Sequence, residues 1–229
     1  MALALLDLIF PPRCVHCHAY LEYGRALCAD CRRWIVLHRT FFCGKCRARR
    51  YSSARKLCHR GFPFLLGAAG EYEDPIIKGL IRSLKFHFVR SSAAPLGAIL
   101  AAYARRLKIP DSYDVILPMP LSRRRLRERG FNQSELIARS LSVRTGIPIN
   151  TVALLRTRHA PPQSGLHDDS KRRANIAGSF EVISPRAIHG RNIILLDDVI
   201  TSGATMLEAT RVLRAAGARN ILALAAAKA

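Results

Sequence analysis

Residues 193–205 read IILLDDVITSGAT, and this stretch is the strongest indication of the fold class. Its four leading apolar residues predict a strand buried on both faces, as in a parallel sheet. Residues 206–216 then predict a helix that ends at Gly217. The sequence therefore predicts an α/β domain, and two adjacent carboxylates stand where its strand meets the turn before the helix.

The turn between this strand and this helix predicts a phosphate site. Free backbone N–H groups at residues 202–205 and the positive end of the helix dipole favour an anion, and Gly203 lets the backbone approach it closely. Asp197 and Asp198 would repel a phosphate, so we expect them to accept hydrogen bonds from the vicinal hydroxyls of a ribose. The predicted ribose 5-phosphate site consists of Asp197, Asp198, Thr201, Ser202, Gly203, Ala204 and Thr205.

The same stretch resembles the phosphoribosyl pyrophosphate (PRPP) signature of type I phosphoribosyltransferases, an apolar strand followed by Asp-Asp and a Thr-Thr/Ser-Gly-Ala-Thr loop. The match runs without a gap through Thr205. The resemblance implies a type I phosphoribosyltransferase-like fold, a mostly parallel sheet flanked by helices. It also implies PRPP or a related ribose phosphate as ligand, with Mg2+ and arginines on the pyrophosphate. The alternative is an acid pair that merely caps a helix.

Seven cysteines near the other end of the chain predict zinc. A C-x2-C pair sets two thiolates on one turn, and two such pairs close a tetrahedral site. The expected ligands are Cys14, Cys17, Cys28 and Cys31 for a first zinc, and Cys43, Cys46, Cys58 and His59 for a second, weaker site. An odd cysteine count and the lack of a secretory signal argue against disulfides. Spacing alone leaves open whether the pairs are swapped between two metals.

Composition predicts two basic domains, a zinc-binding module that resembles a double zinc ribbon at residues 1–62 and an α/β domain at residues 63–229. The formal net charge of +21 favours a polyanionic partner, although an arginine-rich solvated surface is the alternative. Aromatic residues among the arginines of the first module suit stacking on single-stranded bases. Residues 1–10 are apolar but too short to span a bilayer, so we expect a short amphipathic helix and a cytoplasmic protein.

The middle of the chain predicts helices that begin at Pro75, at Ala93 and after Asn132, and a strand at residues 115–117. A loop rich in arginine follows that strand, and we expect it to face the same crevice as the Asp197 turn. Residues 156–180 predict a lid that excludes water, or a surface loop of no consequence. The arginines expected on the pyrophosphate are Arg123, Arg124, Arg125, Arg127, Arg129, Arg172 and Arg173.

Several short segments together resemble the ComF (ComFC/GntX-like) family. They are residues 10–17, Leu84-Lys85-Phe86, Pro118-Met119-Pro120-Leu121, Arg129-Gly130-Phe131-Asn132-Gln133, Gln163-Ser164-Gly165-Leu166, residues 172–175 and the Asp197 loop. The resemblance implies a zinc module, a phosphoribosyltransferase fold and a role on incoming single-stranded DNA, with competence-machinery proteins as partners. Gly61 departs from the eight-cysteine pattern of the family. Two functions stay open, a phosphoribosyltransferase with an unidentified acceptor and a DNA-binding accessory protein that uses PRPP only as a ligand.

Overall fold

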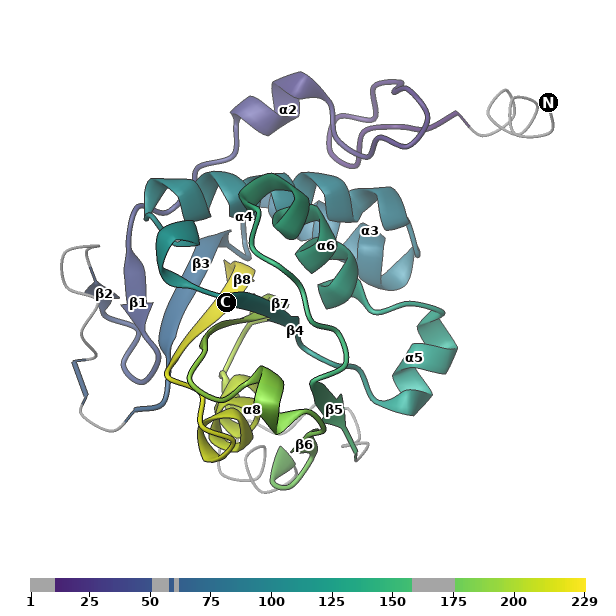
Figure 1. The fold of residues 1–229 in the computed structure, drawn as a ribbon. Helices are drawn as coiled ribbons and strands as arrows, with labels where there is room; N and C mark the ends of the chain where they lie inside the picture. The colour runs from purple at the N-terminus through teal and green to yellow at the C-terminus, as the bar shows by residue number, and fades with distance from the viewer. Residues whose placement is uncertain (1–10, 51–57, 60–61, 158–175) are drawn as a thin grey trace.

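A six-stranded sheet forms the centre of the molecule in a computed structural model that describes residues 11–50, 58–59, 62–157 and 176–229 (Figure 1). The strand order is β2-β1-β3-β8-β7-β4. β3, β8, β7 and β4 are parallel, whereas β1 and β2 join one edge antiparallel. The strands are β1 (Phe41–Cys43), β2 (Arg49–Arg50), β3 (Leu65–Glu71), β4 (Val115–Pro118), β7 (Asn192–Ile200) and β8 (Asn220–Lys228). The predicted α/β class with a mostly parallel sheet is confirmed.

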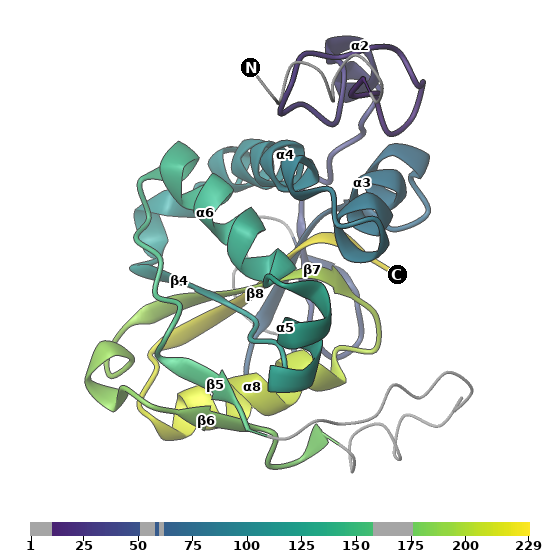
Figure 2. The ribbon, with the colours of Figure 1, turned by 90° about the vertical axis from the view of Figure 1, so that its right-hand side faces the viewer.

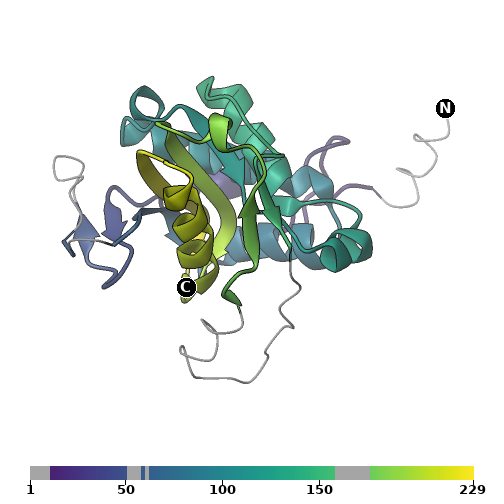
Figure 3. The same ribbon diagram turned by 60° about the horizontal axis from the view of Figure 1, so that its bottom comes forward.

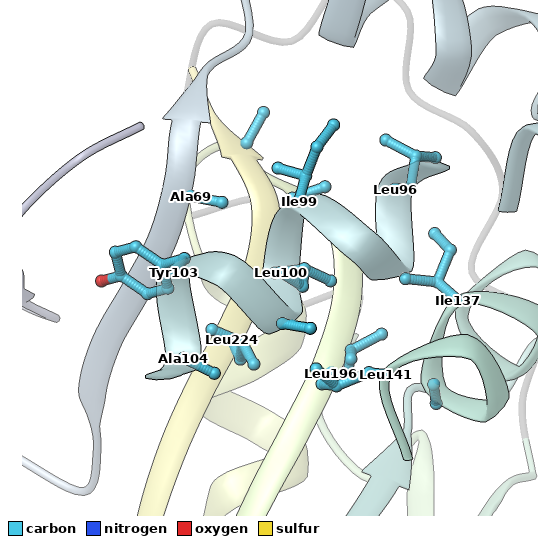
Figure 4. Packing of buried hydrophobic residues seen from close by; sticks show 14 of the residues in the cluster. Ala69, Leu96, Ile99, Leu100, Tyr103, Ala104, Ile137, Leu141, Leu196 and Leu224 are labelled. Atoms are coloured by element: carbon cyan, nitrogen blue, oxygen red, sulfur yellow. The ribbon is translucent and has the colours of Figure 1, made fainter. Parts of the chain in front are cut away.

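Helices cover both faces of this sheet, because its central strands are apolar on both sides. Ile194 and Leu196 of β7 face the core beneath α3 (Pro75–Phe86), α4 (Ala93–Arg106) and α6 (Gln133–Thr145). Figure 4 shows Leu196 packed with residues of α4 and α6. Ile193 and Leu195 face the opposite core, which α8 (Ala204–Ala215) covers (Figures 2 and 3). An antiparallel pair of strands, β5 (Leu154–Arg156) and β6 (Phe180–Val182), lies beside α8.

Capping residues fix where the predicted helices begin and end. Asp74 accepts hydrogen bonds from the backbone N–H groups of Ile76 and Ile77, and Asn132 accepts one from that of Ser134. Gly146 ends α6 with a positive φ of 75°. One prediction is wrong: Arg123–Arg129 is helix α5 and not a loop, because Ser122 accepts a hydrogen bond from the backbone of Arg125 and caps it.

Two parts of the N-terminal segment that pack against the sheet domain are residues 11–33 and β1. Residues 11–33, which include α2 (Ala29–Arg33), lie above α3 and α4 (Figure 2), and Cys14 and Cys31 belong to the core on that side. β1 then enters the sheet beside β3. The expected helix at residues 1–10 and most of the expected lid, residues 158–175, lie outside the described residues. Among the described helices, none has the length and apolar character that a membrane crossing requires.

Candidate functional site

Asp197 and Asp198 lie side by side near the carboxyl end of β7. Asp198 is 2% exposed, and its Oδ2 lies 2.7 Å from Nζ of Lys85 on α3. Oδ1 of Asp197 accepts hydrogen bonds from Oγ of Ser134 at 2.8 Å and from the backbone N–H of Asp198 at 2.9 Å. The pair is therefore held rigidly by groups from α3, α6 and β7.

Burial, and then the adjacent charge of Asp198, raises the pKa of Asp197 to about 7. The ammonium of Lys85 and the hydroxyl of Ser134 oppose this effect. The protein therefore takes up a proton at this pair close to neutral pH, and its negative charge there is smaller than two carboxylates would give in water.

The turn after β7 presents the N-terminus of α8 to the same side. Gly203 occupies the N-cap position with φ of 78° and ψ of 6°, a left-handed conformation that L side chains rarely adopt. Gly203 offers no capping side chain, and Oγ of Ser202 accepts the N–H of Ala204 at 3.4 Å. Thr201 and Ser202 are exposed, and Thr205 is half-buried. The geometry suits a bound anion.

One pocket of about 520 Å³ joins the carboxylates to this turn. Its polar lining includes Lys85, Arg125, Arg129, Gln133, Arg156, Asp197, Asp198, Thr201 and Thr205. Helix α5 directs Arg125 and Arg129 into the pocket, since residues four apart share one helical face. The structure therefore brings two of the seven predicted arginines to the carboxylates.

The other predicted arginines divide into two groups. Arg123, Arg124 and Arg127 do not line the pocket, and Arg124 pairs with Glu128 at 2.7 Å on the exposed side of α5. Arg172 and Arg173 lie outside the described residues.

Sequence reasoning missed three polar residues of the pocket, Lys85, Gln133 and Arg156. Arg156 lies on β5 with its guanidinium 5.4 Å from the centre of the Phe180 ring, and burial lowers its pKa. The sequence does predict that some cation lies near the acid pair, because a buried acid pair at the end of a strand requires one. It does not predict that this cation is Lys85, since the contact between α3 and β7 is long-range.

Two groups of four metal-binding side chains occur in the described residues. The ligand atoms of Cys14, Cys17, Cys28 and Cys31 all lie within 4.8 Å of one another, as do those of Cys43, Cys46, Cys58 and His59. Sγ of Cys17 is 3.7 Å from that of Cys28, and Sγ of Cys46 is 3.5 Å from that of Cys58. A tetrahedron of bonds of about 2.3 Å places ligands roughly 3.8 Å apart, so both groups fit zinc.

The C-x2-C turns at residues 14–17 and 43–46 have the same backbone. His18 and Arg47 follow them with φ of 60° each. Their N–H groups donate to the carbonyls of Cys14 at 3.0 Å and Cys43 at 2.9 Å. Although burial opposes it, hydrogen bonds from backbone N–H groups lower the pKa of both Cys14 and Cys43 to about 6, which favours the thiolate that binds a metal. The chain thus builds the same knuckle twice.

A basic groove lies between α2 and the helices α4 and α6. Two adjoining hollows of about 310 and 470 Å³ share Arg32, Ala98 and Arg144 in their lining, and Arg25 and Arg105 extend it at the two ends. No acidic side chain of the described residues lines either hollow.

Comparisons with known proteins bear on both parts of the chain. Residues 5–62 match the model of the double zinc ribbon domain. The chain is 31% identical to "Competence protein F" of Haemophilus influenzae, over 91% of this chain and 93% of that protein. It is 30% identical to "DNA utilization protein YhgH" of Escherichia coli O157:H7, over 91% and 86% respectively. The B. subtilis glutamine PRPP amidotransferase overlays on 59% of this chain and 26% of its own, at 20% identity and a TM-score of 0.40.

Proposed function

The chain belongs to the family that includes competence protein F and DNA utilization protein YhgH, and we propose that it serves DNA uptake or utilisation and binds a ribose 5-phosphate ligand such as PRPP. One observation carries the ligand: a buried carboxylate pair and a glycine-capped helix N-terminus line one pocket with three arginines. Carboxylates suit ribose hydroxyls, and the helix end suits a phosphate.

Each part of the pocket has a separate task in this proposal. The loop 201–205 donates hydrogen bonds to the 5-phosphate, while Asp197 and Asp198 accept them from the ribose hydroxyls. Arg125, Arg129 and Arg156 lie where the pyrophosphate of PRPP would extend, and Mg2+ bound with PRPP would neutralise part of its charge. Lys85 pairs with Asp198 beside the ribose, because its Nζ lies 2.7 Å from that carboxylate.

Neighbouring arginines on α5 give a matched test of the pocket. Arg125 lines it, whereas Arg124 is exposed and paired with Glu128. Calorimetry with PRPP and Mg2+ should show a loss of about 1.5–3 kcal/mol in binding free energy for Arg125→Ala, the value of a hydrogen bond to a charged group. Arg124→Ala should bind as the wild type does. Equal affinities in all three proteins would place the ligand elsewhere.

We also propose two zinc ions in residues 1–62, one on Cys14, Cys17, Cys28 and Cys31 and one on Cys43, Cys46, Cys58 and His59. The support is the ligand spacing of both groups and the match to a double zinc ribbon. In the same proposal, residues 63–229 form the phosphoribosyltransferase-like domain. Zinc here holds the fold of a segment that has little apolar core of its own.

Single-stranded DNA is the polyanionic partner that we propose for the basic groove between the two parts. Four arginines and no acidic side chain of the described chain line the groove, and Trp34, next to its wall at Ile35, is 78% exposed. Guanidinium groups suit the phosphates, and an exposed indole suits a stacked base. The groove is distinct from the Asp197 pocket, so DNA and PRPP can bind together.

Transfer of the phosphoribosyl group to an acceptor is the second function that we propose. A half-buried pocket that holds both a ribose and a pyrophosphate would favour it, because a shielded ribose carbon escapes hydrolysis as pyrophosphate leaves. Release of pyrophosphate from PRPP in the presence of DNA or a nucleobase tests this function. If PRPP binds but is never consumed, transfer is excluded and only the role of PRPP as a ligand remains.

A further inference from the structure

Arg47 belongs to the second cysteine group by sequence and to the phosphate loop by position. It directly follows Cys46, and its guanidinium Nη2 donates a hydrogen bond to the carbonyl oxygen of Thr201. A Cβ placed on Gly203 would lie 3.6 Å from the same nitrogen. A positive charge from the N-terminal segment therefore covers the loop where the 5-phosphate is expected.

The knuckle fixes the direction in which the Arg47 side chain leaves the backbone. Its φ of 60° and its N–H bond to the carbonyl of Cys43 leave the residue one local conformation. The four ligand atoms of this group come together only in that folded turn, with Sγ of Cys58 3.2 Å from Nδ1 of His59. A metal that binds these ligands therefore holds Arg47 in its place on the loop.

The knuckle is in turn locked to the sheet domain. Cys43 pairs with Leu65 of β3, and a Cβ on Gly44 would lie only 2.4 Å from the Phe62 ring, so the turn is packed tightly against it. The Arg214 guanidinium on α8 donates to the carbonyl of Pro63 at 3.0 Å. The second metal group and α8, whose N-terminus forms the phosphate loop, are thus parts of one packed unit.

We propose that Arg47 is a phosphate-binding and positioning residue of the ribose-phosphate site, and that the metal at Cys43, Cys46, Cys58 and His59 controls the affinity of that site through it. The inference rests on the proposed ribose-phosphate function. Loss of the metal releases the knuckle, withdraws the guanidinium from Thr201 and lowers the affinity for the phosphate. By thermodynamic linkage, a bound ribose phosphate raises the affinity for this metal by the same factor.

The first knuckle supplies the matched control. His18 stands where Arg47 stands in the second knuckle, with the same φ of 60°, but its side chain is exposed. Neither knuckle lines the Asp197 pocket itself, and what sets the second one apart is the hydrogen bond from Arg47 to the carbonyl of Thr201. Ribose phosphate should therefore be coupled to one of the two metal sites and not to the other.

The test uses ribose 5-phosphate and the zinc-loaded full chain. Calorimetry should show a loss of about tenfold for Arg47→Ala and for Cys58→Ser, within the roughly 5–150-fold range of allosteric couplings, and no loss for His18→Ala. In the wild type, ribose 5-phosphate should protect one zinc against a competing chelator by about the same factor. That protection should vanish in Arg47→Ala, a change that a merely structural role of the side chain would not produce.

The outcomes separate this inference from the function beneath it. A wild type that binds no ribose 5-phosphate defeats the proposed function itself. If the wild type and Arg47→Ala bind ribose 5-phosphate equally tightly, the function stands and the coupling is overturned. The same holds if ribose 5-phosphate does not change the loss of either zinc ion from the wild type. The chelator measurement needs no variant, so misfolding of Cys58→Ser cannot obscure it.

Discussion

The substitution Asp197→Asn should shift the stability of the protein, relative to the wild type, in favour of the variant as the pH rises, and it should weaken the ligand site. The raised pKa of Asp197, about 7 against an ordinary 3.8, means that the folded protein holds this proton more tightly than the unfolded chain does. Its contribution to stability is full below pH 3.8 and is lost as the pH rises through 7. A pKa change of one corresponds to about 1.4 kcal/mol, so the wild type should lose about 2–3 kcal/mol between pH 5 and pH 8 from this group.

Urea unfolding of both proteins at pH 5, 6, 7 and 8 measures the effect. The amide oxygen of the variant can still accept the Ser134 hydroxyl but carries no charge, so the difference in unfolding free energy should move by about 2–3 kcal/mol in favour of the variant as the pH rises. Both proteins keep the same cysteines, and their titration cancels in the difference. Asp111→Asn, at an exposed aspartate, controls for the substitution itself. A difference that is flat with pH, or that moves in favour of the wild type as the pH rises, would show that Asp197 does not carry the raised pKa.

The remaining predictions concern the metals, the loop and the groove. Elemental analysis should find two zinc ions per chain, with one lost in Cys28→Ser and the other in Cys58→Ser; a single zinc in the wild type would remove the second site. Gly203→Ala should cost about 1–2 kcal/mol of stability in urea unfolding, because φ is 78° there, and unchanged stability would contradict that strain. Alanine at both Arg32 and Arg144 should weaken single-stranded DNA binding and reduce its log–log salt slope by about 1.4. An unchanged slope would place the DNA on another surface.

The local features of the fold could be predicted because each is written in adjacent residues. The apolar run before Asp197 predicted a buried strand, and the Asp74-Pro75 and Asn132 caps predicted where α3 and α6 begin. Helix α5 escaped prediction because its arginines show no apolar period, and its one apolar residue, Leu126, is 44% exposed. Without the helix, the sequence could not tell which arginines face the pocket.

The contacts that complete the site are long-range, and no local pattern contains them. Lys85 reaches Asp198 because α3 packs over the sheet, and Arg47 reaches Thr201 because β1 pairs with β3 at the sheet edge. The three residues of β1 are too few to predict a strand. The sequence therefore predicted a separate domain for the cysteine segment and did not predict that β1 joins the sheet.

A structure of the protein with PRPP and Mg2+ would decide between the proposed pocket and any other site. We expect the 5-phosphate on the backbone N–H groups of residues 202–205 and the ribose hydroxyls within hydrogen-bond distance of Asp197 and Asp198. The pyrophosphate should lie beside Arg125 and Arg129. Ligand bound anywhere else, or an empty pocket at saturating PRPP, would contradict the proposed ribose-phosphate site.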